Sequence, residues 1–270
     1  ISGTLRTLIK HKQPIRRLYP KTMTTMLTNI FLLKQPVLLS GLLLLAGFNY
    51  PSYKTPASSP HDAWHELLGK HVDASGKVDY QGFKADKAML DVYLQSLADN
   101  PPAETWSRAE KMAFWINAYN AFTIDLIIDN YPVSSILNLD GGKTWDVKRI
   151  TLGGKKYSLN QIENEILRPV FKDPRIHFAL NCAAKSCPPL YNKAFTAENL
   201  ERALEQRTRQ FINDANFNSL TAEKASVSKI FEWYAADFGD LKTYLNKYAV
   251  EKLNNSTAIG FLKYNWALNE

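Results

Sequence analysis

The sequence contains little cysteine, and its first part contains no acidic residues. Two cysteines in 270 residues are too few for a disulfide-stapled scaffold. Hydrophobic residues make up 45% of the chain and charged residues 22%, a balance that excludes disordered and collagen-like proteins. No apolar stretch approaches the roughly 20 residues of a bilayer-spanning helix, which excludes a polytopic membrane protein. What remains is a globular domain with an N-terminal extension.

The positive charge of the chain is confined to its first part. The formal charge is +7 at pH 7, which by itself would suggest a nucleic-acid or membrane-surface partner. Of the 33 lysines and arginines, eight lie in residues 1–59, where there is no acid; residues 60–270 hold the other 25 against all 26 acids. A nearly neutral domain has no basic stripe to follow phosphates, so we expect no nucleic-acid partner.

The N-terminal segment has the pattern of an export signal. Val37–Phe48 is an apolar run of 12 residues preceded by Lys34, and this length is typical of a signal peptide. Residues 49–60 are rich in proline and serine, as linkers are. We therefore predict that residues 1–59 are a basic leader with a signal peptide or anchor, and that residues 60–270 form one exported domain in the periplasm or envelope. Such a protein meets the membrane only through an uncleaved N-terminal segment.

Helical patterns dominate residues 60–270. Four residues within Trp64–His71 recur at helical spacing and would share one helix face. Ser107–Glu110 is a capping box before a segment that is apolar almost all round as far as Asn130, which predicts a buried central helix. Further helices are expected over residues 83–97, from the capping box Ser158–Gln161 to Pro169, after Thr196 with Leu200, Ala203, Leu204, Phe211 and Ile212 inward, and over residues 241–249.

Strand patterns are fewer. Val147–Leu152 and Lys155–Leu159 flank Gly153-Gly154 and predict a hairpin with a two-residue turn. In Ile176–Asn181 every second residue (Ile176, Phe178, Leu180) is a large apolar one, and the residues between them are His177, Ala179 and Asn181, a pattern that predicts a strand. Further strands are expected at 217–220, 225–228 and 260–266. Because there is no β–α–β rhythm, the predicted fold class is α+β: a mostly helical single domain with a small antiparallel sheet around the central helix.

The segment Arg175–Leu190 carries the most chemistry, because two thiols, an amide, a lysine and a hydroxyl follow a predicted strand. One interpretation is a catalytic Cys182 with His177 as its base. In an extended chain these residues would lie roughly 16 Å apart and on opposite faces, so the loop would have to fold back. Lys185 would lower the pKa of a nearby thiol without acting as its base.

Two other interpretations of the same loop stay open. A disulfide between Cys182 and Cys187 would be either a structural staple or a redox-active pair, although the spacing is not that of a C-x-x-C motif. A metal site made of both cysteines and His177 would lack the fourth ligand of tetrahedral zinc, so we expect no metal. The sequence has no P-loop, dinucleotide-binding or H-E-x-x-H motif, so we expect no cofactor.

Polar residues elsewhere are candidates for shaping a cleft near the thiols. Asn117 and Asn120 are three residues apart on the central helix, so they either satisfy the backbone of neighbouring loops or line the cleft. Glu163 either pairs with Arg168 or Arg175 or faces the same cleft. The remaining candidates belong to the loop itself: Asn181, Lys185 and Ser186.

Four long stretches of the chain match one known pattern. They are AFWINAYNAF (113–122), YSLNQIENEILRPVFKDPRIHFALNCAAKSCPPL (157–190), VSKIFEWYAADFG (227–239) and FLKYNWALN (261–269). In this order, and covering nearly all of residues 61–269, they resemble the domain-of-unknown-function family 547. The last two stretches are rich in aromatic residues, which we expect to belong to the core.

The resemblance implies that His177 and Cys182 belong to the family pattern, whereas Cys187 is typical of bacterial members and is serine in plant-like ones. Where the family often has Ile-Glu-His, this chain has Asn164, so a catalytic histidine at that position would be missing. Some plant members follow a leucine-zipper segment and others accompany a glutaredoxin domain, which suggests interaction or redox roles. A cysteine-peptidase-like fold is an analogy for such domains.

Three hypotheses for an exported domain follow. The first is a thiol-dependent hydrolase or acyl transferase that uses Cys182, with His177, Asn117, Asn120 and Glu163 in its cleft. The second is a non-catalytic interaction module with a structural disulfide between Cys182 and Cys187. The third is thiol–disulfide redox exchange. Each would act on a small molecule or on a peptide or protein partner.

Overall fold

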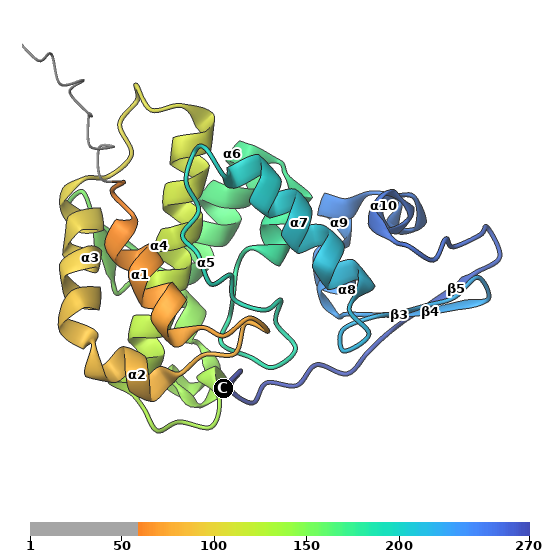
Figure 1. The fold of residues 1–270 in the computed structure, drawn as a ribbon, viewed down its shortest axis with the longest axis horizontal. Coiled ribbons are helices and arrows are strands. Elements are labelled where there is room, and N and C mark those ends of the chain that lie inside the picture. Colours follow the sequence, from red (N-terminus) through yellow and green to blue (C-terminus); the bar gives the residue numbers. More distant parts are fainter. Residues whose placement is uncertain (1–58) are drawn as a thin grey trace, which may run out of the picture. The chain divides into compact units, whose positions relative to one another are not determined.

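The structure is a computed structural model that describes residues 59–270 (Figure 1). The predicted leader, including the apolar run Val37–Phe48, lies outside the described residues except for Ser59. Within the described part, no helix is both long enough and apolar enough to cross a membrane.

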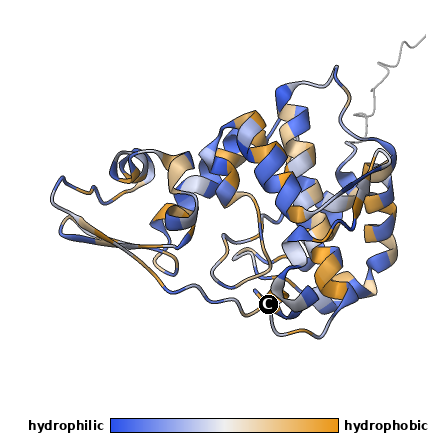
Figure 2. Ribbon diagram, turned by 180° about the vertical axis from the view of Figure 1, so that it is seen from behind, coloured by the Kyte–Doolittle hydropathy of each residue, from blue (hydrophilic) through white to orange (hydrophobic). Residues whose placement is uncertain are grey.

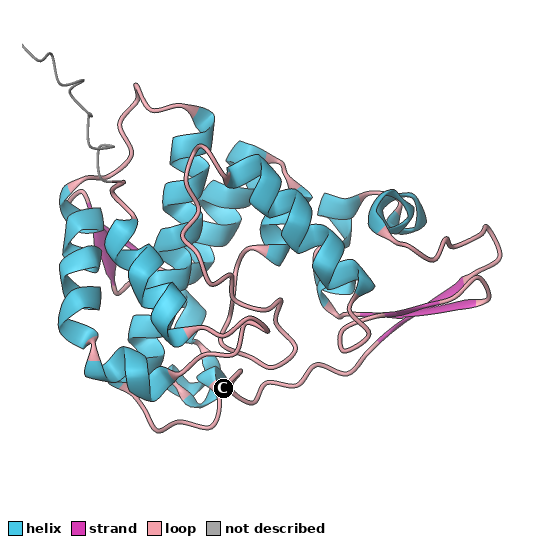
Figure 3. Cartoon of the chain, in the orientation of Figure 1, coloured by secondary structure: helices cyan, strands magenta, loops and turns pink. Residues whose placement is uncertain are grey.

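Helices make up most of the described chain, and the strands are short and lie at two separate places (Figure 3). The helices are α1 (Asp62–His71), α2 (Tyr80–Ala85), α3 (Lys87–Asp99), α4 (Arg108–Asp129), α5 (Leu159–Gln161), α6 (Arg168–Phe171), α7 (Leu200–Asn213), α8 (Ile230–Trp233), α9 (Ala235–Phe238) and α10 (Leu241–Tyr248). The strands are β1 (Ile150–Leu152), β2 (Lys155–Tyr157), β3 (Ser219–Leu220), β4 (Lys224–Val227) and β5 (Ala258–Phe261). The α+β fold class is therefore confirmed.

The helix α4 is the buried centre of the larger of two hydrophobic clusters, as predicted. Its capping box is present: the Ser107 hydroxyl accepts a hydrogen bond from the Glu110 amide, and the Glu110 carboxylate accepts one from the Ser107 amide. It packs against α2, α3 and the helix that contains Glu163. The predicted face of α1 is buried as well, at Trp64 and His71 among others.

The expected helix over residues 83–97 is two helices, α2 and α3. The chain leaves the helical conformation at Asp86, where φ is −96° and ψ is 19°. The Asp86 carboxylate accepts a hydrogen bond from Nε2 of His71 at 2.7 Å and pairs with Lys70. This tie to α1 explains why the chain turns at Asp86 instead of continuing as one helix.

The strands of the two small sheets lie close to their predicted positions, but one pair of strands is parallel where antiparallel pairing was expected. The strands β1 and β2 form the predicted antiparallel hairpin, with Ile150 opposite Tyr157. Gly153 and Gly154 both have positive φ, at 56° and 75°, as a two-residue hairpin turn requires. The second sheet has the order β3-β4-β5, in which β3 and β4 are antiparallel but β4 and β5 are parallel. The expectation of a purely antiparallel sheet is corrected on this point.

The helix that begins at the Ser158 capping box ends near Pro169, as predicted, since its last residue is Phe171. Between α5 and α6 the segment Ile162–Leu167 is π-helical, and the Arg168 amide donates to the carbonyl of Glu163, five residues earlier. Proline has no N–H, and it is tolerated here at the start of the α6 segment. The helix ends when Lys172 adopts a left-handed conformation, with φ at 46°.

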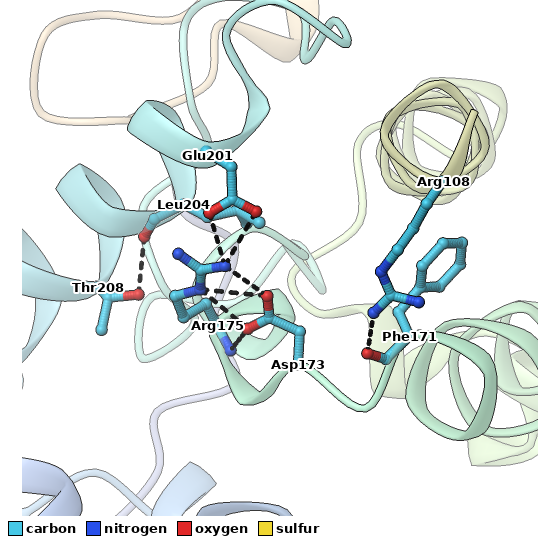
Figure 4. A network of polar contacts seen from close by, with 7 residues as sticks. All are labelled: Arg108, Phe171, Asp173, Arg175, Glu201, Leu204 and Thr208. Carbon is cyan, nitrogen blue, oxygen red and sulfur yellow. Dashed lines mark hydrogen bonds and ion pairs between the residues drawn. The ribbon is translucent and has the colours of Figure 1, made fainter.

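The predicted strand Ile176–Asn181 is wrong, because Pro174–Phe178 is a 3-10 helix. The Asp173 carboxylate accepts the Arg175 amide at 3.0 Å and caps it, and proline fits its first turn. All six residues from Ile176 to Asn181 are buried, so the alternation did not separate an inner from an outer face. Figure 4 shows the Arg175 guanidinium between Asp173 and Glu201 of α7, which ties this segment to α7.

A second hydrophobic cluster forms around Phe178, Phe211 and Phe231, apart from the one around α4. It gathers residues from α7, β4, α8, α9 and α10. Figure 2 shows hydrophobic and hydrophilic stretches side by side on the helices, as expected where each helix buries one face. Phe178 follows directly after His177, so this cluster also fixes the end of the 3-10 segment that leads to the thiols.

Candidate functional site

The loop that carries the thiols is held at both ends by two amides of α4. The Asn120 amide donates to the Ala179 carbonyl at 2.9 Å and accepts from the Asn181 amide N–H at 2.9 Å. The Asn117 side chain bonds both the carbonyl and the N–H of Phe195, at 2.7 and 3.0 Å. Both asparagines are buried, and their side chains form hydrogen bonds with the backbone of neighbouring loops. This is one of the two roles expected for them; the other was to line the cleft.

The interior of the loop is also fixed by polar contacts. Asn181 donates to the Pro188 carbonyl at 2.9 Å and accepts from the Ala183 N–H at 2.9 Å. The Ser186 hydroxyl accepts the amide of Asn265 at 2.8 Å, and the Lys185 amide donates to the carbonyl of Ala267 at 2.8 Å. Asn181 and Ser186 therefore shape the loop, while the Lys185 side chain is left exposed.

The two thiols lie in direct contact and differ in their surroundings. Their sulfur atoms are 2.7 Å apart without a disulfide between them, and Cys182 is half-buried whereas Cys187 is buried. The Tyr264 hydroxyl lies 3.1 Å from the Cys182 sulfur. The hydrogen bond from Cys187, with a smaller contribution from Tyr264, lowers the pKa of the Cys182 thiol below its ordinary value. Burial raises the pKa of the Cys187 thiol well above its own.

A cavity of about 210 Å³ opens beside Cys182, and we call it the thiol cavity. Its lining comes from four separate parts of the chain: Tyr119; Trp145, Asn160, Glu163 and Asn164; His177, Leu180, Cys182, Cys187 and Pro188; and Ile230, Trp233, Tyr234, Tyr264 and Trp266. The cavity brings together four of the predicted residues, namely Cys182, Cys187, His177 and Glu163. Asn117, Asn120, Asn181, Lys185 and Ser186 do not line it.

His177 is bound to a residue that the sequence did not single out. Its Nε2 atom lies 2.7 Å from Oδ2 of Asp237, which also accepts a hydrogen bond from Nε of Arg168 at 2.6 Å. His177 and Arg168 together hold the pKa of the Asp237 carboxyl well below its usual range. The ring of Tyr234 stacks on the imidazole with 4.0 Å between ring centroids. Among residues 59–270, no histidine is hydrogen-bonded to Cys182.

Glu163 is buried in the lining without a cationic partner. The pairing with Arg168 or Arg175 is wrong, because Arg168 pairs with Asp237, and Arg175 pairs with Asp173 and Glu201. The side chain is 8% exposed, and no ion pair joins it to any other described residue. Burial and the neighbouring Glu163 raise the pKa of the Tyr234 hydroxyl. The cavity therefore contains a carboxylate whose charge no cation offsets by direct contact.

A comparison with protein families finds a match for part of the chain. The sequence model described as "Protein of unknown function, DUF547" matches residues 103–212. The chain is a DUF547-like protein. The match includes α4 with both of its asparagines, Glu163, His177 and the two cysteines. No curated protein and no solved structure matches the chain.

Several lining residues of this DUF547-like protein were missed from the sequence. Trp233 and Tyr234 belong to the stretch 227–239, and Tyr264 and Trp266 to the stretch 261–269, whose aromatic residues were expected to be core. Asp237, which binds His177 but does not line the cavity, also belongs to the first stretch. That expectation holds for Phe231 and Phe238, which are buried, and Tyr234, Tyr264 and Trp266 pack against the core while they line the cavity. It does not hold for Trp233 and Phe261, which are exposed. The one signal for these residues was their place in two stretches, outside the matched residues 103–212, that the sequence analysis found to resemble the family.

Position 164 also lines the thiol cavity, which gives the missing histidine of the family pattern a location. Here it is Asn164, which accepts a hydrogen bond from the Arg168 guanidinium at 2.6 Å and donates one to Asn160. An amide at this place binds and orients but does not take up a proton. The bases that line the cavity are therefore the Glu163 carboxylate and the His177 imidazole.

A larger cavity, of about 750 Å³, lies against the same loop but does not include Cys182. It is lined by Lys185, Arg207 and Glu270 among others, and Cys187 borders both cavities. Cys182, the thiol of lowered pKa, lines the smaller cavity. Within the described residues, no group of three histidine, cysteine, aspartate or glutamate side chains is arranged to bind a metal ion.

Proposed function

We propose that this DUF547-like protein performs thiol–disulfide exchange, with Cys182 as the attacking thiol and Cys187 as the resolving thiol. One observation carries the proposal: the sulfur atoms are 2.7 Å apart, and their pKa values are shifted in opposite directions. A lowered pKa increases the fraction of thiolate at a given pH, and the attacking species in exchange is the thiolate. A half-buried Cys182 at a cavity and a buried Cys187 behind it fit these two roles.

The reaction balances without a metal or a bound cofactor. The Cys182 thiolate attacks one sulfur of a substrate disulfide, forms a mixed disulfide, and releases the first substrate thiol. Cys187 then attacks the Cys182 sulfur and gives its proton to the departing second thiolate. The substrate disulfide is reduced to two thiols, and the protein is oxidised to a Cys182–Cys187 disulfide, which an external dithiol returns to the reduced state.

Reaction with 2-hydroxyethyl disulfide, followed by mass spectrometry, tests the proposal. We expect the reduced wild-type protein to end as an internal disulfide and to release about two equivalents of mercaptoethanol. Cys187→Ser should stop at the mixed disulfide with about one equivalent released, and Cys182→Ser should stay unmodified because Cys187 is buried. If the wild type stops at the mixed disulfide, Cys187 is not a resolving thiol. If the protein is isolated oxidised and resists dithiols, the pair is a structural staple of an interaction module.

A second candidate is a thiol-dependent hydrolase or acyl transferase, and it rests on a different observation. The imidazole of His177, oriented by Asp237, lines the same cavity as Cys182. A substrate that enters between them would place its ester or amide within reach of both groups. Reaction with p-nitrophenyl acetate tests this hypothesis. It predicts an acyl-enzyme on Cys182, and in the His177→Gln variant the hydrolysis of that acyl-enzyme should be roughly a hundredfold slower than in the wild type. Equal decay of the acyl-enzyme in both proteins would remove it.

We also propose that the protein is exported to the periplasm or envelope. The apolar run Val37–Phe48 supports this, and disulfide exchange suits an oxidising compartment. Cell fractionation of the full chain and of Leu44→Arg, which interrupts the run, is the test. We expect the wild type outside the cytoplasm and the variant inside it. The same distribution for both would contradict export through this segment.

A further inference from the structure

We infer that the thiol cavity binds an alkylammonium group, so that the preferred substrates are disulfides with a positively charged amine near the sulfur atoms. The substrate preference extends the proposed function, and it depends on that function in one respect: the disulfide is assumed to react in this cavity. Binding of the cation itself follows from the lining of the cavity and does not require any reaction of Cys182.

The first argument is the Glu163 carboxylate. It is 8% exposed and lines the cavity, and among residues 59–270 it has the Tyr234 hydroxyl as a hydrogen-bonding neighbour but no ion-pair partner. A carboxylate taken out of water is costly unless a cation or several hydrogen bonds compensate it. A ligand that brings a cation into the cavity would supply that compensation.

The second argument is the aromatic wall of the same cavity. Trp145, Trp233, Tyr264 and Trp266 are in mutual contact, with ring centroids 4.5 to 5.8 Å apart in the contacting pairs. Aromatic rings attract cations through their quadrupole, and rings gathered around a site are a recurrent way of binding ammonium groups. In the described part of the chain, no lysine or arginine lies over any of these four rings.

The third argument is the charge of the remaining lining. No lysine or arginine of the described chain lines the thiol cavity, so no side-chain cation already occupies it. Asp237 does not compete for the ligand, because Arg168 and His177 already bind its carboxylate. The neighbouring Tyr234 already binds a cation, since the Arg168 guanidinium lies 5.0 Å from its ring centroid. A thiolate at Cys182 adds a further negative charge.

The size of the cavity agrees with a small head group. A volume of about 210 Å³ holds an ammonium group with a few carbon atoms and leaves the rest of a larger molecule outside. Cys182 and Glu163 line the same small space, so a substrate would carry its amine and its disulfide only a few bonds apart. Cystamine has this arrangement, and 2-hydroxyethyl disulfide is its neutral counterpart.

A binding experiment on Cys182→Ser tests the cation site without any exchange chemistry. n-Butylammonium and choline are titrated at constant ionic strength, with 1-butanol as the neutral control, and tryptophan fluorescence is recorded, since Trp145, Trp233 and Trp266 line the cavity. We expect saturable binding of at least one cation and none of butanol. Glu163→Gln in the same background should weaken binding roughly tenfold or more, whereas Glu165→Gln, an exposed neighbour on the same helix, should not.

The results of the titrations support or overturn the cation site. Binding of n-butylammonium alone identifies the head group as a primary ammonium, and binding of choline alone identifies it as a quaternary one. Failure of both cations, equal binding of butanol, or no effect of Glu163→Gln overturns the inference. Circular dichroism of the Gln variants establishes that they remain folded.

A kinetic experiment on the wild type separates this inference from the proposed function. Cystamine should react with Cys182 roughly tenfold faster than 2-hydroxyethyl disulfide, after correction for the ratio seen with a free thiol, and Glu163→Gln should remove that preference. Exchange without a preference for cystamine would overturn the ammonium site and leave the exchange activity standing. Cation binding without exchange would overturn the activity and leave the site standing.

Discussion

Asp237 Oδ2 lies 2.7 Å from His177 Nε2, although 60 residues separate them in the sequence. The same carboxylate binds Arg168, so one side chain joins α9, the 3-10 segment and α6. Of these three segments, the 3-10 segment contributes its His177 to the lining of the thiol cavity. Removing this carboxylate should therefore affect the stability of the domain and the position of the imidazole together.

Asp237→Asn should lower the free energy of unfolding by roughly 1–3 kcal/mol near pH 7, because Arg168 and His177 lose a charged acceptor. The pKa of Asp237 is depressed in the folded state, so its contribution is complete above the unfolded pKa, near 4, and is lost as the pH falls further towards the folded pKa. Urea unfolding at several pH values measures the difference between the proteins. It should shrink below about pH 4; a difference that stays constant to pH 2 would contradict this account.

His61 should give a different pH dependence. It is buried, its Nδ1 lies 2.8 Å from the Tyr93 hydroxyl, and burial lowers its pKa to about 4. Since the unfolded chain takes up the proton near pH 6.5, stability should fall as the pH drops from about 6.5 to 4, by up to roughly 2–3 kcal/mol. His61→Asn should be less stable at pH 7 but lack this slope. His65→Asn, at an exposed position of the same helix, should keep it.

Cys187→Ala should raise the midpoint pH of Cys182 alkylation by iodoacetamide. The hydrogen bond from Cys187 is the main cause of the lowered Cys182 pKa, so its removal shifts that pKa back towards the ordinary thiol value near 8.5. Cys187→Ser keeps a donor and should give a midpoint between those of the wild type and the alanine variant. Tyr264→Phe should shift the midpoint less than Cys187→Ala. Identical midpoints in all four proteins would mean that the Cys182 thiol is not tuned by these contacts.

Asn120→Ala should destabilise the domain by roughly 2–4 kcal/mol, because it leaves the buried Ala179 carbonyl and Asn181 N–H without partners. It should also make Cys182 react faster with large alkylating reagents, since the start of the loop is released. Asn130→Ala, at the exposed end of the same helix, is the matched control and should stay within about 1 kcal/mol of the wild type. Unfolding by urea and labelling with a maleimide dye measure the two effects.

The predictions that succeeded depended on local features of the sequence. Both capping boxes, at Ser107 and Ser158, start helices as expected, because their hydrogen bonds span only three residues. The hairpin β1–β2 also lies where the Gly153-Gly154 turn predicted it. The predicted strand at Ile176–Asn181 failed because every residue there is buried, and alternation has meaning only when one face is exposed.

The candidate site could be predicted only in part, because its essential contacts are long-range. Cys182, Glu163 and His177 were recognised from the sequence, and the structure places them around one cavity. The partner of His177 could not be found, since nothing in the sequence indicates that Asp237 folds back onto it. The assumed partner of Glu163 was wrong for the same reason: Arg168 lies close in sequence but is occupied by Asp237.

The paired asparagines of α4 have a consequence for how this protein can change over evolution or by design. Residues 182–194 begin and end at backbone groups that Asn117 and Asn120 hold, so the helix, and not the loop sequence, determines where the segment starts and stops. In evolution or design, a change at Asn117 or Asn120 should therefore displace the whole segment with both cysteines, although neither asparagine lines the thiol cavity.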